Sequence, residues 1–274
     1  MKIKSFGKIN LNLKVLDETI NGLHKIESLI IPIDLYDVIE MKEIDKNQDI
    51  ITFNFMNIPE KNTVSKSLDL LRDINDFSQH FEIKITKNIP QESGLGGGSS
   101  NAGAIIAKLS EIYNLSVPSY KDVALKIGSD VPFFINGKPA FVTGIGDIIE
   151  PKNIDIEINM ILVVPKEVVS TANAFAEFDQ LENTSTLVNT YKEIEIFNDF
   201  WTPSTSIEPK LIKIKENLES ITNLDFYLSG SGSSMFSLGD KEELTKKIDL
   251  IDLNQFKLVT LVKKIDFSFE TISD

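Results

Sequence analysis

A glycine-rich segment in the first half of the chain has the residue types of a phosphate-binding loop. Gly94-Leu95-Gly96-Gly97-Gly98-Ser99-Ser100-Asn101 places four glycines within five residues and follows them with two hydroxyls. Glycine lets the backbone turn its N–H groups toward a ligand and lets that ligand approach closely. The segment therefore predicts an anion site, and phosphate is the anion most often bound in such loops.

A predicted strand precedes this loop and a predicted helix follows it. Before the loop, Phe81, Ile83 and Ile85 alternate with polar residues, as in a half-buried strand. After the loop, five apolar residues recur at helical spacing: Ala102, Ile105, Ile106, Leu109 and Ile112. The start of that helix adds unpaired N–H donors and a positive dipole end to the site. The simpler alternative, a flexible glycine hinge, requires neither the strand nor the hydroxyls.

Two well-known phosphate loops are excluded. No Gly-Lys-Ser or Gly-Lys-Thr follows the glycines, so the segment is not a Walker A loop. The dinucleotide-binding pattern fails at its last glycine, where Ser99 stands. A phosphate site without the Walker lysine needs positive charge from elsewhere, and the candidates are Lys8, Lys14, Lys84 and Lys87.

Asp130 is the candidate acid–base group if the reaction transfers phosphate to a hydroxyl. That reaction depends mostly on positioning and charge neutralisation, with a carboxylate accepting the hydroxyl proton. Asp130 lies in a Gly-Ser-Asp-Val-Pro turn between a predicted helix and a predicted apolar hairpin. Simpler alternatives stay open at this point. Asp130 could be a solvated turn residue, Lys8 a surface lysine, His24 a structural histidine, and residues 229–234 a hairpin tip.

The composition limits the classes of protein and partner. The chain has 274 residues, of which 42 % are hydrophobic, and a mean hydropathy of -0.03, which suits one large or two medium globular domains. There are no cysteines and only two histidines, so thiolate, disulfide and histidine-rich metal chemistry are excluded. The formal charge of -13 argues against a nucleic-acid partner. With no membrane-length apolar run and no signal peptide, we expect a cytoplasmic protein without a membrane partner.

Local patterns predict an α+β chain. Strands are expected at 9–15, in one or two pieces within 26–41, and at 51–55, 81–86, 158–164, 226–228, 235–238 and 256–262. Helices are expected from a cap at 62 or 63 to about 77, from 99 onward, and at 119–127, 171–178, 209–221 and 242–251. Residues 131–135 and 138–142 flank Asn136-Gly137 and predict a two-residue hairpin. A polar segment is expected at 182–190. The pattern restarts near 151–155, which predicts domains at 1–152 and 153–274, the second with split βαβ order.

Three segments, in this order, resemble the GHMP kinase superfamily: Gly7-Lys8-Ile9-Asn10-Leu11, the Gly94–Asn101 loop, and Leu228-Ser229-Gly230-Ser231-Gly232-Ser233. Further similarity lies at 21–24, 128–134, 144–151 and 198–200, so it covers nearly the whole chain. The resemblance implies a two-domain fold, with an N-terminal domain like ribosomal protein S5 and a ferredoxin-like C-terminal domain. It also implies ATP and Mg²⁺ as cofactors, and a monomer or weak homodimer.

The resemblance further implies ATP-dependent phosphorylation of the 2-hydroxyl of a cytidine-diphosphate-linked methylerythritol, in non-mevalonate isoprenoid synthesis. Lys8 and Asp130 match the catalytic pair. The ATP-binding positions are Asn62, Lys87, Pro90, Gly94, Leu95, Gly96, Gly97, Gly98, Ser99, Ser100 and Asn101. The substrate-binding positions are Asn10, His24, Phe175, Ser229 and Gly230. The magnesium ligands stay unassigned; the hydroxyl of Ser99 or Ser100 is a candidate.

Two positions depart from the pattern of the superfamily members that it most resembles. Leu23 stands where a tyrosine would stack on the cytosine opposite Phe175, and Glu92 stands beside the phosphate loop, where small residues are usual. Glu92 must point away from the phosphates or help to hold magnesium. The alternatives are another GHMP kinase, acting on mevalonate, phosphomevalonate or homoserine, and a nucleotide-binding protein without catalysis. Retention of both Lys8 and Asp130 argues against the last.

Overall fold

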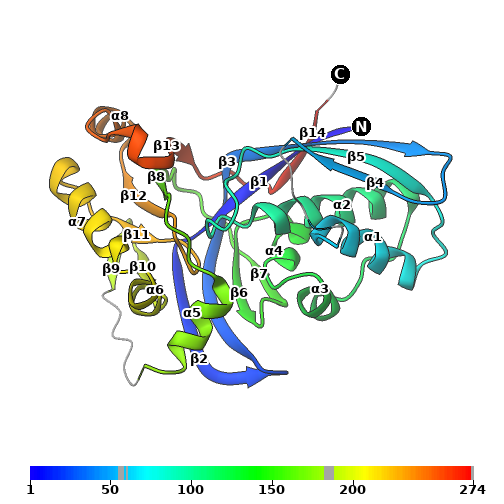
Figure 1. The fold of residues 1–274 in the computed structure, drawn as a ribbon, viewed down its shortest axis with the longest axis horizontal. Coiled ribbons are helices and arrows are strands. Elements are labelled where there is room, and N and C mark those ends of the chain that lie inside the picture. Colours follow the sequence, from blue (N-terminus) through cyan, green and yellow to red (C-terminus); the bar gives the residue numbers. More distant parts are fainter. Residues whose placement is uncertain (55–58, 60, 182–187, 273–274) are drawn as a thin grey trace.

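The computed structural model describes residues 1–54, 59, 61–181 and 188–272, and its described elements form two sheets with helices packed on them (Figure 1). The strands are β1 (Lys2–Asn10), β2 (Asn12–Ile20), β3 (Leu23–Ile44), β4 (Ile50–Phe53), β5 (His80–Thr86), β6 (Ala140–Gly144), β7 (Ile148–Pro151), β8 (Asn159–Pro165), β9 (Asn189–Tyr191), β10 (Ile194–Asn198), β11 (Tyr227–Leu228), β12 (Met235–Gly239), β13 (Phe256–Lys263) and β14 (Phe269–Ile272). The helices are α1 (Thr63–Ile74), α2 (Gly97–Tyr113), α3 (Tyr120–Lys126), α4 (Val131–Asn136), α5 (Thr171–Phe178), α6 (Trp201–Ile207), α7 (Lys210–Thr222), α8 (Lys241–Ile248) and the short 3₁₀ turn η1 (Leu253–Gln255).

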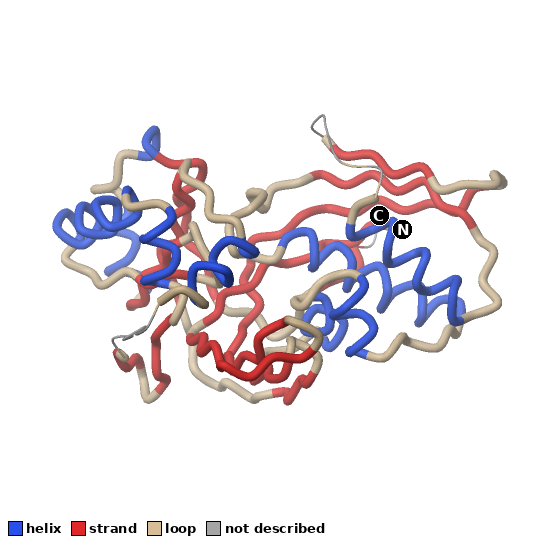
Figure 2. Tube along the Cα trace, turned by 60° about the horizontal axis from the view of Figure 1, so that its bottom comes forward, coloured by secondary structure: helices blue, strands red, loops and turns tan. Residues whose placement is uncertain are grey.

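The long strand β3 organises the larger sheet. It spans 22 residues and pairs with β1, β2, β5 and β6, so it carries most of the sheet's connections. Helices α1–α4 gather on one face of this sheet, and α6–α8 lie around the other end of the molecule (Figures 1 and 2). The smaller sheet has the order β11-β12-β8-β13, with antiparallel pairs. No helix in the described ranges is both long and apolar enough to cross a membrane.

The core beneath the larger sheet follows from the predicted periodicity. Helix α1 buries Leu68 and Leu71 against β5 and α2, with Ile83 and Ile105 fully buried in the same cluster. The predicted cap at Asn62 is confirmed: its side chain accepts hydrogen bonds from the Val64 and Ser65 amides. This cap fixes where α1 begins, at the edge of the glycine loop.

The predicted hairpin around Asn136-Gly137 is wrong at its first strand. Residues 131–136 form helix α4, with Pro132 in its first turn and Gly137 ending it at φ +79°. The buried Phe134 packs so closely on α2 that a side chain at Gly103 would meet its Cβ at 2.5 Å. A short continuous apolar run does not distinguish a strand from a buried helix, so packing decided the structure here. Strand β6 instead pairs with β3 and β7.

Other elements differ in their limits. The strand predicted at 9–15 is two strands, β1 and β2, separated at Leu11, and the pieces predicted within 26–41 form the single strand β3. Asn21 and Gly22, both at positive φ, form the turn that connects β2 to β3. Position 55 of the predicted strand 51–55, and positions 182–187 of the predicted polar segment, lie outside the described residues. Strand β9 begins at Asn189, in the described end of that polar segment.

Segments from after residue 152 return to the larger sheet. Strand β10 pairs in parallel with β2, and β14 pairs antiparallel with β1. Just before β14, the Ser268 amide donates to the Gly137 carbonyl at the end of α4, and its hydroxyl donates to the Phe134 carbonyl. The Ser268 carbonyl accepts from the Phe6 amide on β1. The chain thus ties β1 to α4 through its last described strand, and the domain limit at 152/153 stays a prediction.

Candidate active site

The start of helix α2 opens into a cleft of about 420 Å³. Its walls come from the glycine loop, the start of α1, the end of β5, Asp130 and the start of α5. The predicted site residues that line it are Asn62, Lys87, Pro90, Gly94, Gly96, Gly97, Gly98, Ser99, Asn101 and Asp130. The backbone N–H groups of the first turn of an α-helix have no partner within the helix, so this end of α2 suits an anion.

Close contacts on both sides explain why the loop is made of glycine. Gly94 and Gly96 have φ values of +77° and +69°, which favour glycine. A side chain at Gly94 would meet the Ser229 carbonyl oxygen at 2.3 Å, and one at Gly96 would meet the Phe134 ring at 2.9 Å. The loop is therefore held between the second glycine–serine segment and α4.

Lys8 and Asp130 meet beside this loop. Lys8 Nζ lies 3.5 Å from Asp130 Oδ2; the lysine side chain is 4 % exposed and the aspartate side chain 33 % exposed. Strand β1 positions Lys8, whose amide donates to the Leu95 carbonyl of the loop at 2.9 Å. Asp130 occupies the position just before α4. The pair is thus a buried cation next to a carboxylate that reaches the cleft.

Asn10, two residues beyond Lys8 on β1 and also buried, completes this cluster. Lys8 Nζ donates to Asn10 Oδ1, and Asn10 Nδ2 donates to the Ser28 hydroxyl at 2.8 Å. The backbone N–H of Asn10 donates to the Ser229 hydroxyl at 3.3 Å, which ties β1 to the second glycine–serine segment. A side chain at Gly230 would meet Lys8 Nζ at 3.2 Å. The predicted substrate residues Asn10, Ser229 and Gly230 therefore lie around Lys8.

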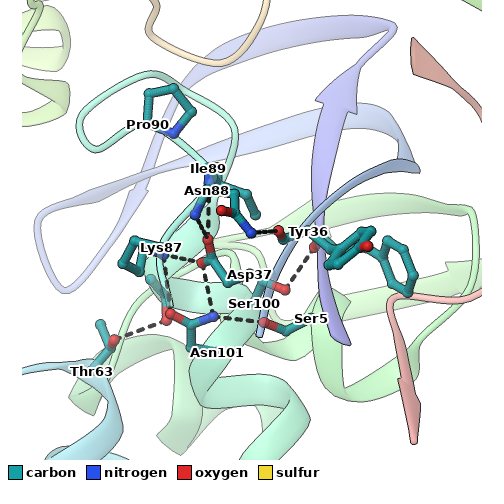
Figure 3. Close-up of polar contacts among 12 residues, drawn as sticks. Ser5, Tyr36, Asp37, Thr63, Lys87, Asn88, Ile89, Pro90, Ser100 and Asn101 are labelled. Carbon is teal, nitrogen blue, oxygen red and sulfur yellow. Dashed lines mark hydrogen bonds and ion pairs between the residues drawn. The ribbon is translucent and has the colours of Figure 1, made fainter. Parts of the chain in front are cut away.

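A second lysine–aspartate pair lies under the glycine loop (Figure 3). Lys87 Nζ pairs with Asp37 Oδ2 and donates to Asn101 Oδ1 at 3.1 Å. Asp37 also accepts from the amides of Asn88 and Ile89, at 2.8 and 2.9 Å, and from Asn101 Nδ2 at 3.0 Å. Burial lowers the pKa of Lys87, and the adjacent Asp37 carboxylate opposes that shift. This network fixes the entry to the loop and the first turn of α2.

His24 and Phe175 meet at a separate place, where the β2–β3 hairpin approaches α5. Their rings are nearly parallel, at 11°, with centroids 5.7 Å apart. The rings of Phe200 and Phe175 pack edge to face, with their centroids 4.7 Å apart. Leu23, where a second stacking ring would stand, is exposed. The structure thus brings the two predicted base-binding residues into one aromatic cluster.

Some predicted residues lie behind or outside the cleft, and one charged residue beside the glycine loop was not predicted from the sequence. Leu95 and Ser100 are fully buried, and the Ser100 hydroxyl donates to the Phe6 carbonyl. Lys14 and Lys84 are exposed and do not line the cleft. Asp37 was missed, although its place in β3, in step with buried Ile39 and Met41, put a carboxylate on the buried face. Such a carboxylate requires a cation or several donors.

Comparisons with known proteins agree with this architecture. Residues 62–138 match the family model "GHMP kinases N terminal domain". The chain is 31 % identical to the 4-diphosphocytidyl-2-C-methyl-D-erythritol kinase of Clostridioides difficile (strain 630), over 96 % of this chain and 94 % of that protein. It is 35 % identical to the enzyme of that name from Ureaplasma parvum serovar 3, over 89 % and 98 %.

A solved structure of 4-(cytidine 5'-diphospho)-2C-methyl-D-erythritol kinase superposes with a TM-score of 0.76, covering 96 % of this chain and 98 % of that one, at 21 % identity. That likeness confirms the predicted α+β GHMP kinase fold. Together with the identity to the two relatives, it shows that the chain belongs to the 4-diphosphocytidyl-2-C-methyl-D-erythritol kinase family of the GHMP kinases.

Proposed function

We propose that the protein transfers the γ-phosphate of ATP to the 2-hydroxyl of 4-diphosphocytidyl-2-C-methyl-D-erythritol. The observation that carries the proposal is the Lys8–Asp130 pair beside the start of helix α2. A protein that only binds nucleotide needs the anion site but not a buried lysine next to an accessible carboxylate. The names of the full-length relatives support this choice of substrate.

The glycine loop and the first turn of α2 would hold the ATP phosphates. Their backbone N–H groups supply donors, and the helix dipole favours negative charge there. Asn62, Lys87 and Pro90 line the same cleft and would contact the nucleotide. Thr63 fixes the loop from α1, because its hydroxyl donates to the Gly98 carbonyl at 2.8 Å.

Asp130 would orient the attacking hydroxyl and accept its proton, while Lys8 would stabilise the charge on the transferred phosphoryl group. Asn10 holds the Lys8 ammonium in place, so the cation is positioned before substrate binds. Phosphoryl transfer is catalysed mainly by such positioning and charge neutralisation. The proposed reaction therefore needs no covalent intermediate on the protein.

The residues around the cleft fit a magnesium ion that arrives with ATP. Mg²⁺ keeps several waters and is usually held by one or two protein groups plus the phosphates. Within the described part of the chain no cluster of three or more acidic or histidine side chains could hold a metal alone. Asp130, Glu92 and Ser99 line the cleft and would supply the protein oxygens, whereas the Ser100 hydroxyl is engaged with Phe6. The ion would neutralise phosphate charge.

His24 and Phe175 would hold the cytosine. With Leu23 in place of a second aromatic ring, one face of the base lacks a stacking partner. Stacking on an aromatic side chain contributes about 1–3 kcal/mol per base. We expect Leu23→Tyr to lower KM for the cytidylated substrate several-fold and to leave KM for ATP unchanged. An unaltered KM for the substrate would show that Leu23 already supplies the contact.

Coupled ADP release tests the proposed reaction directly. The parent protein and Asp130→Asn are assayed with ATP, magnesium and the cytidylated alcohol, and the parent also with mevalonate, phosphomevalonate and homoserine. Turnover of the cytidylated alcohol, lost in Asp130→Asn, is the expected result. Turnover of another alcohol alone would replace the substrate, and ATP binding without any turnover would leave only a binding function.

We also propose that the enzyme works in the cytoplasm as a monomer or weak homodimer. The candidate groups for both substrates come from one chain, so the proposed site requires no second copy. Sedimentation of the protein with and without ATP checks the oligomeric state. A stable dimer with a partner residue near Asp130 would contradict this view.

A further inference from the structure

The helix that carries Phe175 also places a carboxylate next to His24. Asp179 follows α5 directly, one turn beyond Phe175, and its Oδ1 lies 2.8 Å from His24 Nε2. The other ring nitrogen, Nδ1, lies 2.8 Å from the Leu16 carbonyl oxygen. Each ring nitrogen therefore faces an oxygen that can accept a hydrogen bond.

Helix stability does not explain this carboxylate. The C-terminal end of a helix carries partial negative charge, so an aspartate there is unfavourable. Asp179 is also 53 % exposed. Its contact with His24 uses Oδ1, and a carboxylate can accept further hydrogen bonds at its second oxygen. The position is thus costly for the helix but well suited to a ligand.

The geometry of the rings indicates where a base would lie. Rings that superpose directly approach to about 3.5–4.0 Å. The centroids of His24 and Phe175 are 5.7 Å apart although the rings are nearly parallel, so the two rings are offset. A base that stacks on the same face of the half-buried Phe175 ring as His24 would lie beside His24 and Asp179, with its edge toward them.

We propose that Asp179 is a specificity-determining residue that selects cytosine over uracil, an inference that rests on the proposed cytidine-linked substrate. His24 Nε2 engages Asp179 Oδ1, so the second oxygen of that carboxylate is available to accept a hydrogen bond from a ligand. Cytosine presents the complement to this oxygen, because its N4 amino group is a hydrogen-bond donor. Uracil presents a carbonyl oxygen in place of the amino group, and that oxygen is repelled by the carboxylate.

The same helix connects this base site to the reaction centre. Thr171, at the start of α5, lines the cleft with Asp130, and its hydroxyl bonds to that of Ser231 in the second glycine–serine segment at 2.8 Å. Eight residues of helix separate Thr171 from Asp179, about 12 Å along the axis. This span suits a nucleoside held by its base at one end and reacting beyond its diphosphate at the other.

Binding of cytidine 5'-diphosphate and uridine 5'-diphosphate tests the inference without requiring turnover. Both are titrated calorimetrically into the full-length protein, with a non-hydrolysable ATP analogue and magnesium saturating the ATP site. We expect the parent to prefer the cytidine compound by roughly five- to a hundredfold. Asp179→Asn should lose most of this preference, because an amide can donate to the uracil carbonyl. Asp179→Glu should restore part of it.

Glu177→Gln is the matched control, since it removes the same charge from the same helix. Glu177 accepts from the Ser206 hydroxyl and has no contact with His24 among the interactions described. It should keep the cytidine preference. In steady-state assays, Asp179→Asn should raise KM for the cytidylated substrate and leave kcat and KM for ATP within about twofold, a split that general destabilisation of the protein does not produce.

The outcomes separate this inference from the proposed function. A preference for cytidine that is equal in the parent and in Asp179→Asn overturns the role of Asp179, whatever the enzyme phosphorylates. A parent that binds both compounds equally overturns it as well. A parent that selects cytidine through Asp179 but phosphorylates no cytidylated alcohol overturns the proposed function alone.

Discussion

The two lysine–aspartate pairs beside the glycine loop use the same residue types in opposite ways. Asp37 is fully buried and receives hydrogen bonds from Lys87, Asn101 and two backbone amides. Asp130 is 33 % exposed and stands 3.5 Å from its lysine. A carboxylate whose oxygens already accept several hydrogen bonds holds the structure together. A carboxylate at a cleft that can still accept hydrogen bonds is available to a substrate. The difference lies in what surrounds each pair.

The largest expected effect tests the accessible pair. Asp130→Asn keeps the shape of the side chain but cannot accept a proton, so we expect kcat to fall about 10²–10⁴-fold. The melting temperature should fall less than in Asp37→Asn, because the Asp130 carboxylate is partly solvated and Asn10 still accepts from Lys8 Nζ. Coupled ADP release and thermal unfolding measure the two quantities. A variant that keeps its turnover would make Asp130 a structural residue like Asp37.

The buried pair should show the reverse result. Asp37→Asn leaves the Lys87 ammonium buried without its counter-charge, and breaking a buried ion pair in this way costs about 3–5 kcal/mol. Urea unfolding of the variant should show this loss of free energy. Asp73→Asn, a change at an exposed aspartate of α1, is the control and should stay within about 0.5 kcal/mol of the parent. A stable Asp37→Asn protein would contradict a scaffold role.

The pH dependence of stability sharpens the comparison further. Burial lowers the native pKa of Lys87 below its ordinary value of 10.5. Between the native and ordinary pKa values the unfolded chain holds a proton that the native protein releases, so the free energy of unfolding rises with pH there. Lys87→Gln should remove this rise in unfolding experiments carried out up to pH 10. Lys84→Gln retains Lys87 and should retain the rise; its loss in both variants would assign the rise to another group.

The smallest effect is expected from the two lysines that the cleft does not include. Lys14→Ala and Lys84→Ala remove exposed charges, which usually changes stability by no more than about 0.5 kcal/mol. We expect KM for ATP to change less than twofold in either variant. A large increase would mean that positive charge outside the cleft helps to bind the nucleotide.

The sequence predicted the parts of the site that depend on local pattern. The glycine loop, the strand before it, the helix after it and the cap at Asn62 follow from residue types at short spacing, and the structure contains all of them. The overall GHMP kinase fold followed from three short segments in order. Asp130 was a candidate from its turn alone and Lys8 was one of four candidate lysines. The resemblance selected them as a pair, and the structure places them together.

What the sequence could not predict depended on contacts between distant segments. Helix α4 was mistaken for a strand because only packing against Gly103 distinguishes the two for so short an apolar run. Asp37 and Asp179 each pair with a residue from another part of the chain, Lys87 and His24. No local spacing reports such a pair. Residue spacing alone did not distinguish the four candidate lysines. The resemblance selected Lys8 and Lys87, and the fold buries these two side chains and leaves Lys14 and Lys84 exposed.

The return of β14 to the edge of β1 has a consequence for how the protein is made. Ser268 joins the strand of Lys8 to the helix that begins after Asp130, through hydrogen bonds to Phe6, Phe134 and Gly137. During translation these residues leave the ribosome long after Lys8 and Asp130 have emerged, and contacts so distant in sequence form slowly. We therefore expect a nascent chain to hold its glycine loop and helices before its two catalytic candidates are locked together. The proposed activity would then appear only after synthesis has passed β14.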